Sequence, residues 1–201
     1  MGCDRRQGHI DVSRIHNSIK DTVFFAPGFT LLELVTTVAI VGIVSAMAIS
    51  LYQTSVAKNR IGTEINTFMT DLTFAAAEAV RTGQDVTLCV SVNGTSCSTS
   101  TLWSQGWIIF DDPTGSQQTV TGTVIRRRQP AFSGGDSFTA DNAIAAVTWN
   151  RGGYVSSIAP TIAQVTFTDH ASTVSTATTL CVALGFLGQV TSENPGQGNC
   201  Q

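Results

Sequence analysis

The sequence predicts an α+β protein in which one long N-terminal helix is followed by a head of short antiparallel strands. An almost unbroken apolar run from Phe29 to Leu51 continues into a stretch with a single apolar stripe. After Gly83 the pattern changes to short strand-like segments separated by turn residues. These changes divide the chain into four parts: a leader (1–28), an apolar helix (29–52), an amphipathic helix (53–83) and a β-rich head (84–201).

The apolar run is long enough to cross a membrane. Phe29–Leu51 contains 23 residues, which as a helix span about 35 Å. One carboxylate, Glu33, lies inside this run. An acid in an apolar environment is costly and needs a partner, so Glu33 is a candidate functional residue.

The helix is expected to continue past Lys58-Asn59-Arg60 as an amphipathic helix. Apolar side chains recur there at spacings of three and four: Ile61, Ile65, Phe68, Leu72, Ala75 or Ala76, and Ala79. This stripe is predicted to pack on the head.

Charged residues occupy other positions of this helix, namely Glu64, Asp71, Glu78 and Arg81. Gly83 is a natural C-terminal stop, and the alternative is two separate helices with a break at Gly62.

The head is expected to be antiparallel sheet packed on this helix. Its predicted strands are 85–92, 106–112, 121–128, 144–150, 163–168, 178–183 and 186–190, with a turn at 151–154 that leads into another short strand. The connections are short enough for antiparallel pairing. Trp103 and Trp107 are predicted to fill the core of the head rather than to bind a ligand.

Cysteine usage indicates an oxidising compartment. Cys3 lies in the leader, and the rest of the chain contains Cys89, Cys97, Cys181 and Cys200. An even number in an exported protein suggests two disulfides, with three pairings open. The pairs Cys89–Cys97 and Cys181–Cys200 are favoured because each closes a short local loop. The spacings do not match a zinc site.

Charge and composition favour neither an enzyme nor a nucleic-acid-binding protein. The chain from Phe29 has seven Lys and Arg against eleven Asp and Glu, a formal net charge of −4. His170 is alone, and no serine or cysteine has a base partner by spacing, so no catalytic site, cofactor or metal is expected. Asp111-Asp112, with Asp136 or Asp141, could form a calcium site, but a polar turn is the commoner explanation of such a pattern.

The leader ends in a recognisable pattern, Pro27-Gly28 followed by Phe29-Thr30-Leu31-Leu32-Glu33. This pattern resembles the processing site of type IV prepilins and type II secretion pseudopilins. The resemblance implies that a prepilin peptidase cuts after Gly28 and methylates the new N-terminus at Phe29. Glu33 would pair with the Phe29 amine of a neighbouring subunit during assembly. The alternatives are an ordinary transmembrane anchor and a secretory signal peptide with its cleavage site at Ala46-Met47-Ala48.

Further stretches resemble the GspH/FimT family of minor pilins and pseudopilins: 71–83, 86–89, 103–111 and 124–126. The resemblance implies a single-pass inner-membrane protein with a periplasmic head, which then enters a filament. Its partners would be the prepilin peptidase, the other minor subunits, the major pilin and the inner-membrane assembly platform. We expect a minor type IV pilin that initiates or caps pilus assembly. The alternative is a minor pseudopilin of a type II secretion system.

A third alternative is a DNA-binding minor pilin of a competence pilus. Relatives that bind DNA use arginines near the C-terminus, and the matching place here, Gly188-Gln189-Val190-Thr191, lacks both. The remaining candidate for DNA or partner contact is Arg126-Arg127-Arg128. On a strand, Arg126 and Arg128 would share one face. The simpler interpretation is an edge strand protected by charge.

Overall fold

The computed structural model describes residues 28–119, 122–158, 162–171 and 178–200. The predicted leader up to residue 27, including Cys3, therefore lies outside the described residues. The long helix, α1 (Leu31–Thr82), is continuous over 52 residues, which confirms the prediction of one helix, and the alternative of a break at Gly62 does not occur. It ends where predicted: Gly83 adopts the left-handed conformation with φ 66°, and its N–H donates to the carbonyl of Ala79 at 3.0 Å.

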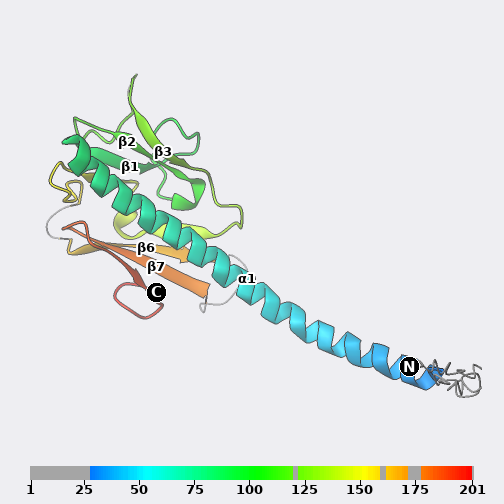
Figure 1. Ribbon diagram of the computed structural model, residues 1–201. Coiled ribbons are helices and arrows are strands. Elements are labelled where there is room, and N and C mark those ends of the chain that lie inside the picture. Colours follow the sequence, from blue (N-terminus) through cyan, green and yellow to red (C-terminus); the bar gives the residue numbers. More distant parts are fainter. Residues whose placement is uncertain (1–27, 120–121, 159–161, 172–177, 201) are drawn as a thin grey trace, which may run out of the picture. The chain divides into compact units, whose positions relative to one another are not determined.

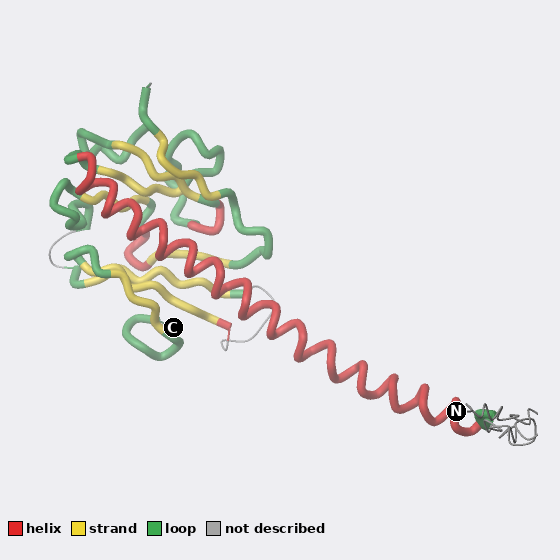
Figure 2. The backbone as a smooth tube through the Cα atoms, viewed as in Figure 1, coloured by secondary structure: helices red, strands yellow, loops and turns green. Residues whose placement is uncertain are grey.

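The head contains two antiparallel sheets rather than one (Figure 1). The strands of the described residues are β1 (Val86–Val90), β2 (Trp107–Asp111), β3 (Ile125–Gln129), β4 (Ser137–Ala140), β5 (Ala146–Trp149), β6 (Gln164–His170), β7 (Thr179–Gly185) and β8 (Val190–Glu193). One sheet has the order β3-β2-β1-β5 and the other β4-β6-β7-β8. Two short 3₁₀ helices, η2 (Trp103–Gln105) and η3 (Asp141–Ala143), lie in the connections (Figure 2).

Two differences from the predicted strands have local causes. β4 was not predicted, because its four residues are too few to show an alternating pattern. The predicted strand 186–190 is instead a tight turn, in which the N–H of Gly188 donates to Gly185 and the N–H of Gly185 donates to Gln189. Gly188 has φ 82°, a conformation that glycine adopts without strain. The last strand therefore begins only at Val190.

The core lies between the second half of α1 and both sheets. The predicted stripe of α1, from Ile61 to Ala79, is buried, together with residues from β1, β2, β6 and β7. Phe68 lies at its centre. Its ring contacts those of Trp103, Trp107, Phe138 and Phe167, with centroids 4.7 to 5.4 Å apart. The two tryptophans are wholly buried, which confirms their predicted place in the core.

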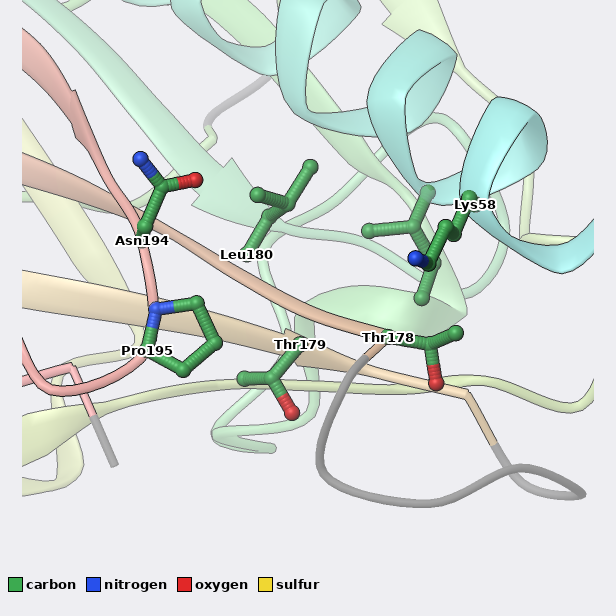
Figure 3. Close-up of a pocket in the computed structure, with 7 residues that line it drawn as sticks. Lys58, Thr178, Thr179, Leu180, Asn194 and Pro195 are labelled. Atoms are coloured by element: carbon green, nitrogen blue, oxygen red, sulfur yellow. The ribbon is translucent and has the colours of Figure 1, made fainter. Parts of the chain in front are cut away.

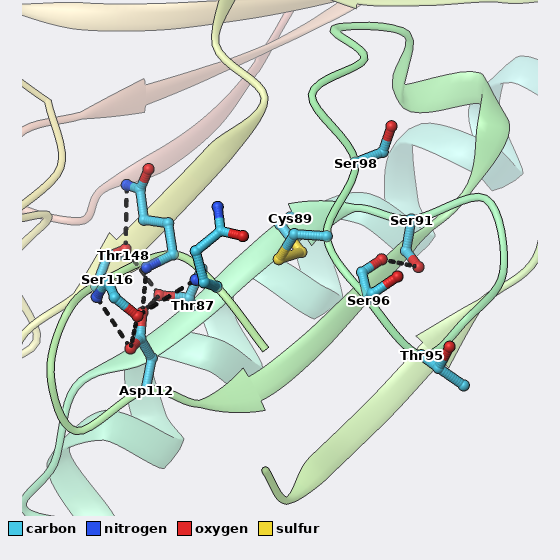
Figure 4. Close-up of a disulfide and its surroundings, with 12 residues drawn as sticks. Thr87, Cys89, Ser91, Thr95, Ser96, Ser98, Asp112, Ser116 and Thr148 are labelled. Carbon is cyan, nitrogen blue, oxygen red and sulfur yellow. Dashed lines mark hydrogen bonds between the residues drawn. A yellow bond between two sulfur atoms is a disulfide. The ribbon is translucent and has the colours of Figure 1, made fainter. Parts of the chain in front are cut away.

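The structure contains both disulfides that the short loops favoured. Cys89 of β1 is bonded to Cys97 in the following loop (Figure 4). Cys181 of β7 is bonded to Cys200, nineteen residues further on. The second bond ties the C-terminal segment to the centre of its sheet, because Cys181 is itself wholly buried. Each bond closes a loop that would otherwise add conformational freedom to the unfolded chain.

Candidate functional site: the N-terminal segment and the charged residues of the helix

The predicted processing residues form an open segment at the start of α1. Gly28, Phe29 and Thr30 precede the helix, and Phe29 is 81% exposed. The hydroxyl of Thr30 accepts a hydrogen bond from the backbone N–H of Glu33 at 3.2 Å. The carbonyl of Thr30 accepts from Leu34, also at 3.2 Å. Thr30 therefore caps the helix, and the bond between Gly28 and Phe29 lies outside helical structure.

The apolar half of α1 exposes its side chains on every side. Each described side chain from Leu31 to Ile49 is exposed, including Leu34, Val38 and Val41 at about 60%. By length and composition this helix is able to cross a membrane. An exposed apolar surface of this extent marks a region that contacts a membrane or another protein. Glu33 is the acid of its first turn.

The acids in the second half of α1 do not face solvent. Asp71 and Glu78 each expose only 6% of their surface. Asp71 accepts a hydrogen bond from the indole of Trp107 at 2.8 Å. Glu78 accepts two bonds from Arg81 at 2.6 and 2.8 Å. These bonds hold the pKa of Glu78 below its usual value. The bond of Asp71 thus joins the helix to the head, whereas the two bonds of Glu78 lie within the helix.

Two of the three arginines of β3 also reach these acids. Arg126 donates to Asp111 through two bonds of 2.6 and 2.8 Å and lies 3.3 Å from Glu78. Arg127 donates to Asp71 at 2.8 Å and lies over the ring of Phe74. Arg128 instead donates to the carbonyl of Gly94, in the loop closed by the first disulfide.

The predicted common face of Arg126 and Arg128 is therefore wrong. The pairing of β2 with β3 shifts register between Ile109 and Phe110, and this bulge breaks the alternation of side chains. As a result, Arg126 and Arg127 both reach α1. The guanidinium groups of Arg126 and Arg127 bond to carboxylates, which leaves little uncompensated charge for phosphate contacts. The turn at Gly188 likewise contains no arginine.

The structure does not bring the alternative calcium ligands together. Asp111 pairs with Arg126, and Asp136 with Arg60. Asp112 accepts from the hydroxyl of Thr87 and from backbone N–H groups of its own turn (Figure 4). Asp141 accepts from the N–H of Thr166. Among the residues that the structure describes, no three Asp, Glu, His or Cys side chains converge as a metal site.

One charged cluster was not foreseen. Arg60 and Glu64 of α1 lie close to Asp136, just before β4, and to Asp169 of β6. The sequence contains no signal for it, since Arg60 and Asp136 are 76 residues apart. Burial, with a smaller effect of the neighbouring Glu64, raises the pKa of Asp169 to about 8.

A small cavity lies beside the same stretch of α1 (Figure 3). Its volume is about 230 Å³, and its lining includes Lys58 and Ile61 of α1, Thr179 and Leu180 of β7, and Pro195. His170, the one histidine after the leader, contacts the hydroxyl of Thr179 at 2.6 Å through its ring nitrogen. His170 and Thr179 are directly paired between β6 and β7, so this contact is a cross-strand hydrogen bond.

The fold and the exposed N-terminal segment define a pilin-like subunit, in which a long helix is apolar in its first half and packed on an antiparallel head in its second. The sequence model of the family described as type II transport protein GspH matches residues 64–188. The chain belongs to this family of minor pilins and pseudopilins, which confirms the resemblance found in the sequence.

A solved structure of a minor pilin has the same fold. The crystal structure of the type IV minor pilin FimU from Pseudomonas aeruginosa is 15% identical, with a TM-score of 0.52, and the match covers 67% of this chain and 89% of that one. The minor pseudopilin EpsH from the type 2 secretion system of Vibrio cholerae is 13% identical, with a TM-score of 0.46, and the match covers 68% and 98% of the two chains. No curated protein sequence matches the chain.

Proposed function

We propose that this protein is a minor type IV pilin that helps to initiate or cap the assembly of a pilus. The observation that carries the proposal is the helix α1, which exposes apolar side chains on all sides from Leu31 to Ile49 and belongs to the same chain as a folded, disulfide-bonded head. Such a surface is covered first by the inner membrane and then by the helices of other subunits in the filament. The head would be periplasmic, where its disulfides are stable.

In this proposal the prepilin peptidase cuts after Gly28 and methylates the amine of Phe29. Cleavage creates a positive charge close to Glu33, one turn into the helix. Both charges would be costly inside an apolar filament core unless they are paired. Pairing of Glu33 on an incoming subunit with the Phe29 amine of a neighbour would set the axial position of each subunit. The partners are the other minor subunits, the major pilin and the inner-membrane assembly platform.

The family also contains subunits of secretion systems, so the second candidate is a minor pseudopilin in protein export. The choice of a pilus rests on the Leu88-Cys89 strand and the loop at 94–97, which resemble the pilus branch. The structure makes this loop a distinct feature, since the Cys89–Cys97 disulfide closes it and Arg128 donates to Gly94. Deletion of the gene in its host separates the candidates: we expect loss of surface pili with protein secretion intact. Loss of secretion with normal pili would favour the pseudopilin.

The processing step is tested by the intact mass and N-terminal sequence of the protein from host membranes. We expect a chain that begins with N-methylated Phe29 in the wild type and an uncut chain for Gly28→Ala. A chain that begins near Ser50 in both strains would indicate a secretory signal peptide instead, and the assembly role of Glu33 would be abandoned.

The role of Glu33 has its own test. In a host whose only copy is Glu33→Ala, we expect the protein to be processed and membrane-bound but absent from sheared filaments. The control is Thr37→Ala, which removes a polar group one turn further along the same exposed segment. This variant should leave incorporation unchanged. Normal incorporation of Glu33→Ala would mean that the apolar segment is only an anchor.

A further inference from the structure

The unforeseen cluster between α1 and the second sheet contains more acids than cations. Arg60 donates to both oxygens of Asp136, each at 2.6 Å. Asp169 is wholly buried, and neither of its oxygens accepts a hydrogen bond from another side chain among the described residues. One oxygen of Glu64 is likewise buried without a donor. The hydrogen bonds of the single guanidinium go to Asp136, and Arg60 acts on Glu64 and Asp169 through its charge alone.

Two adjacent ionised carboxylates at such a site would be costly, because each loses its hydration and they repel one another. A single proton removes both costs. A protonated carboxyl group has one donor, and an ionised carboxylate offers only acceptors. We propose that Glu64 and Asp169 share one proton, and that this bond is a pH-sensitive latch that fastens α1 to β6.

The surroundings of Asp169 favour the protonated form. Desolvation is the largest cause of its raised pKa, followed by the charge of Glu64 and, more weakly, of Asp136, while the backbone of His170 opposes them. Desolvation also raises the pKa of Glu64. The paired neighbour strands β4 and β7 contain no charged side chain. The ring of His170 is bonded to Thr179, and Lys58 lines the cavity beside β7.

The position of the latch gives it a mechanical consequence. Ala57 and Ile61 are the first buried apolar side chains of α1, so Glu64 lies at the start of the stretch that packs on the head. Asp169 is paired with Phe138 of β4 and Leu180 of β7, which places it inside the second sheet. Loss of the shared proton would leave two repelling charges in this interface and loosen the first turns of the packed helix.

The pH dependence has a definite sign. Asp169 is protonated in the folded protein up to a pH of about 8, whereas its ordinary pKa is 3.8. Between these values the folded state binds the extra proton, so the stability from this group is full below the lower value and is lost as the pH rises toward the upper one. An ordinary surface acid would show no such loss.

The test uses the full chain, purified from membranes in detergent micelles, so that it does not depend on filament assembly. The side-chain carboxyl carbon of Asp169 is followed by carbon-detected NMR from pH 3 to 10, together with thermal unfolding over the same range. We expect a midpoint more than two pH units above that of an ordinary aspartate, and a Tm that falls as the pH rises from 5 to 9. Asp169→Asn should flatten this fall.

Two further variants distinguish the shared proton from simple burial. Glu64→Gln supplies a neutral amide donor and should shift the midpoint of Asp169 toward lower pH. Asp85→Asn, at the opposite end of the packed helix, should leave both the midpoint and the profile unchanged. A midpoint near 4 in the wild type would overturn the proposal, and so would an unchanged midpoint in Glu64→Gln. If Asp169→Asn does not fold, the wild-type and Glu64→Gln titrations decide the question alone.

Discussion

Two stretches of one continuous helix differ in which of their side chains are buried. From Leu31 to Ile49 the side chains of α1 are exposed all round and almost entirely apolar. From Ala57 to Ala79 the same helix buries one apolar stripe and two acids. The backbone is helical throughout, so local hydrogen bonding does not distinguish the two stretches. What differs is the partner, which the head supplies for the second stretch and which must come from outside for the first.

This difference shows that the two stretches are stabilised by different partners. Each fully buried large side chain of the stripe contributes roughly 1.5–3 kcal/mol by removal from water. The first stretch gains nothing of this kind from its own chain. Its exposed apolar surface instead becomes the driving force for insertion into a bilayer or for packing among other helices. Substitutions in the two stretches should therefore have separable effects.

The largest expected effect is that of Phe68→Ala. Phe68 is wholly buried and its ring contacts four other aromatic rings, so truncation should lower the free energy of unfolding of the head by about 3–5 kcal/mol. Denaturant unfolding followed by tryptophan fluorescence measures this directly. Leu34→Ala, in the exposed stretch, is the matched control and should leave the head transition unchanged. A large loss for Leu34→Ala would contradict the division of the helix.

A smaller effect is expected from Asp71→Ala. This change leaves the buried indole N–H of Trp107 without its acceptor and deprives Arg127 of its carboxylate. The cost of such unsatisfied groups is about 1–3 kcal/mol. Asp71→Asn keeps an acceptor oxygen for Trp107 and loses only the charge, so it should lower the free energy of unfolding by less than Asp71→Ala does. The comparison separates the contribution of the hydrogen bond from that of the ion pair. Equal costs for both variants would show that the charge, not the acceptor, matters.

The two stretches also differ in how well their roles could be predicted from the sequence. Periodicity revealed the apolar run and the stripe, because helical spacing is a local property. Short separations suggested both disulfides for the same reason. The core position of the two tryptophans followed from their large apolar area. The role of Asp71 in holding the helix to the head could not be predicted, since its partners Trp107 and Arg127 lie on β2 and β3. A bulge decides which arginines of β3 reach the helix.

Long-range pairing explains the remaining failures. The strand β4 has only four residues, and it pairs with β6 across a separation of about thirty residues. No local sequence pattern therefore predicts the second sheet. Asp169 lies in β6, one residue beyond the predicted strand 163–168. The acids that act on it come from α1 and from the segment before β4. The candidate site at Gly28 and Glu33 is the opposite case, since it is a contiguous motif and needed no tertiary contacts to be noticed.

The smallest expected effect is the response of Glu78 to acid, and its sign is opposite to that of Asp169. Hydrogen bonds from Arg81, with a weaker contribution from Arg126, hold the pKa of Glu78 below its ordinary value. The stability from this pairing is present above the ordinary pKa of 4.5 and is lost as the pH falls through the lower, folded value. Because Arg81 is largely exposed, solvent screens the pair and the loss should be comparable to that of a surface ion pair.

Unfolding free energies at pH 7 and pH 3 measure this response in the wild type and in Glu78→Gln. We expect the acid-induced loss to be smaller in the variant. The same loss in both proteins would mean that Glu78 contributes only packing. Together with the titration of Asp169, this comparison would show that the packed stretch of α1 is weakened at its first turns by alkali and at its last turns by acid.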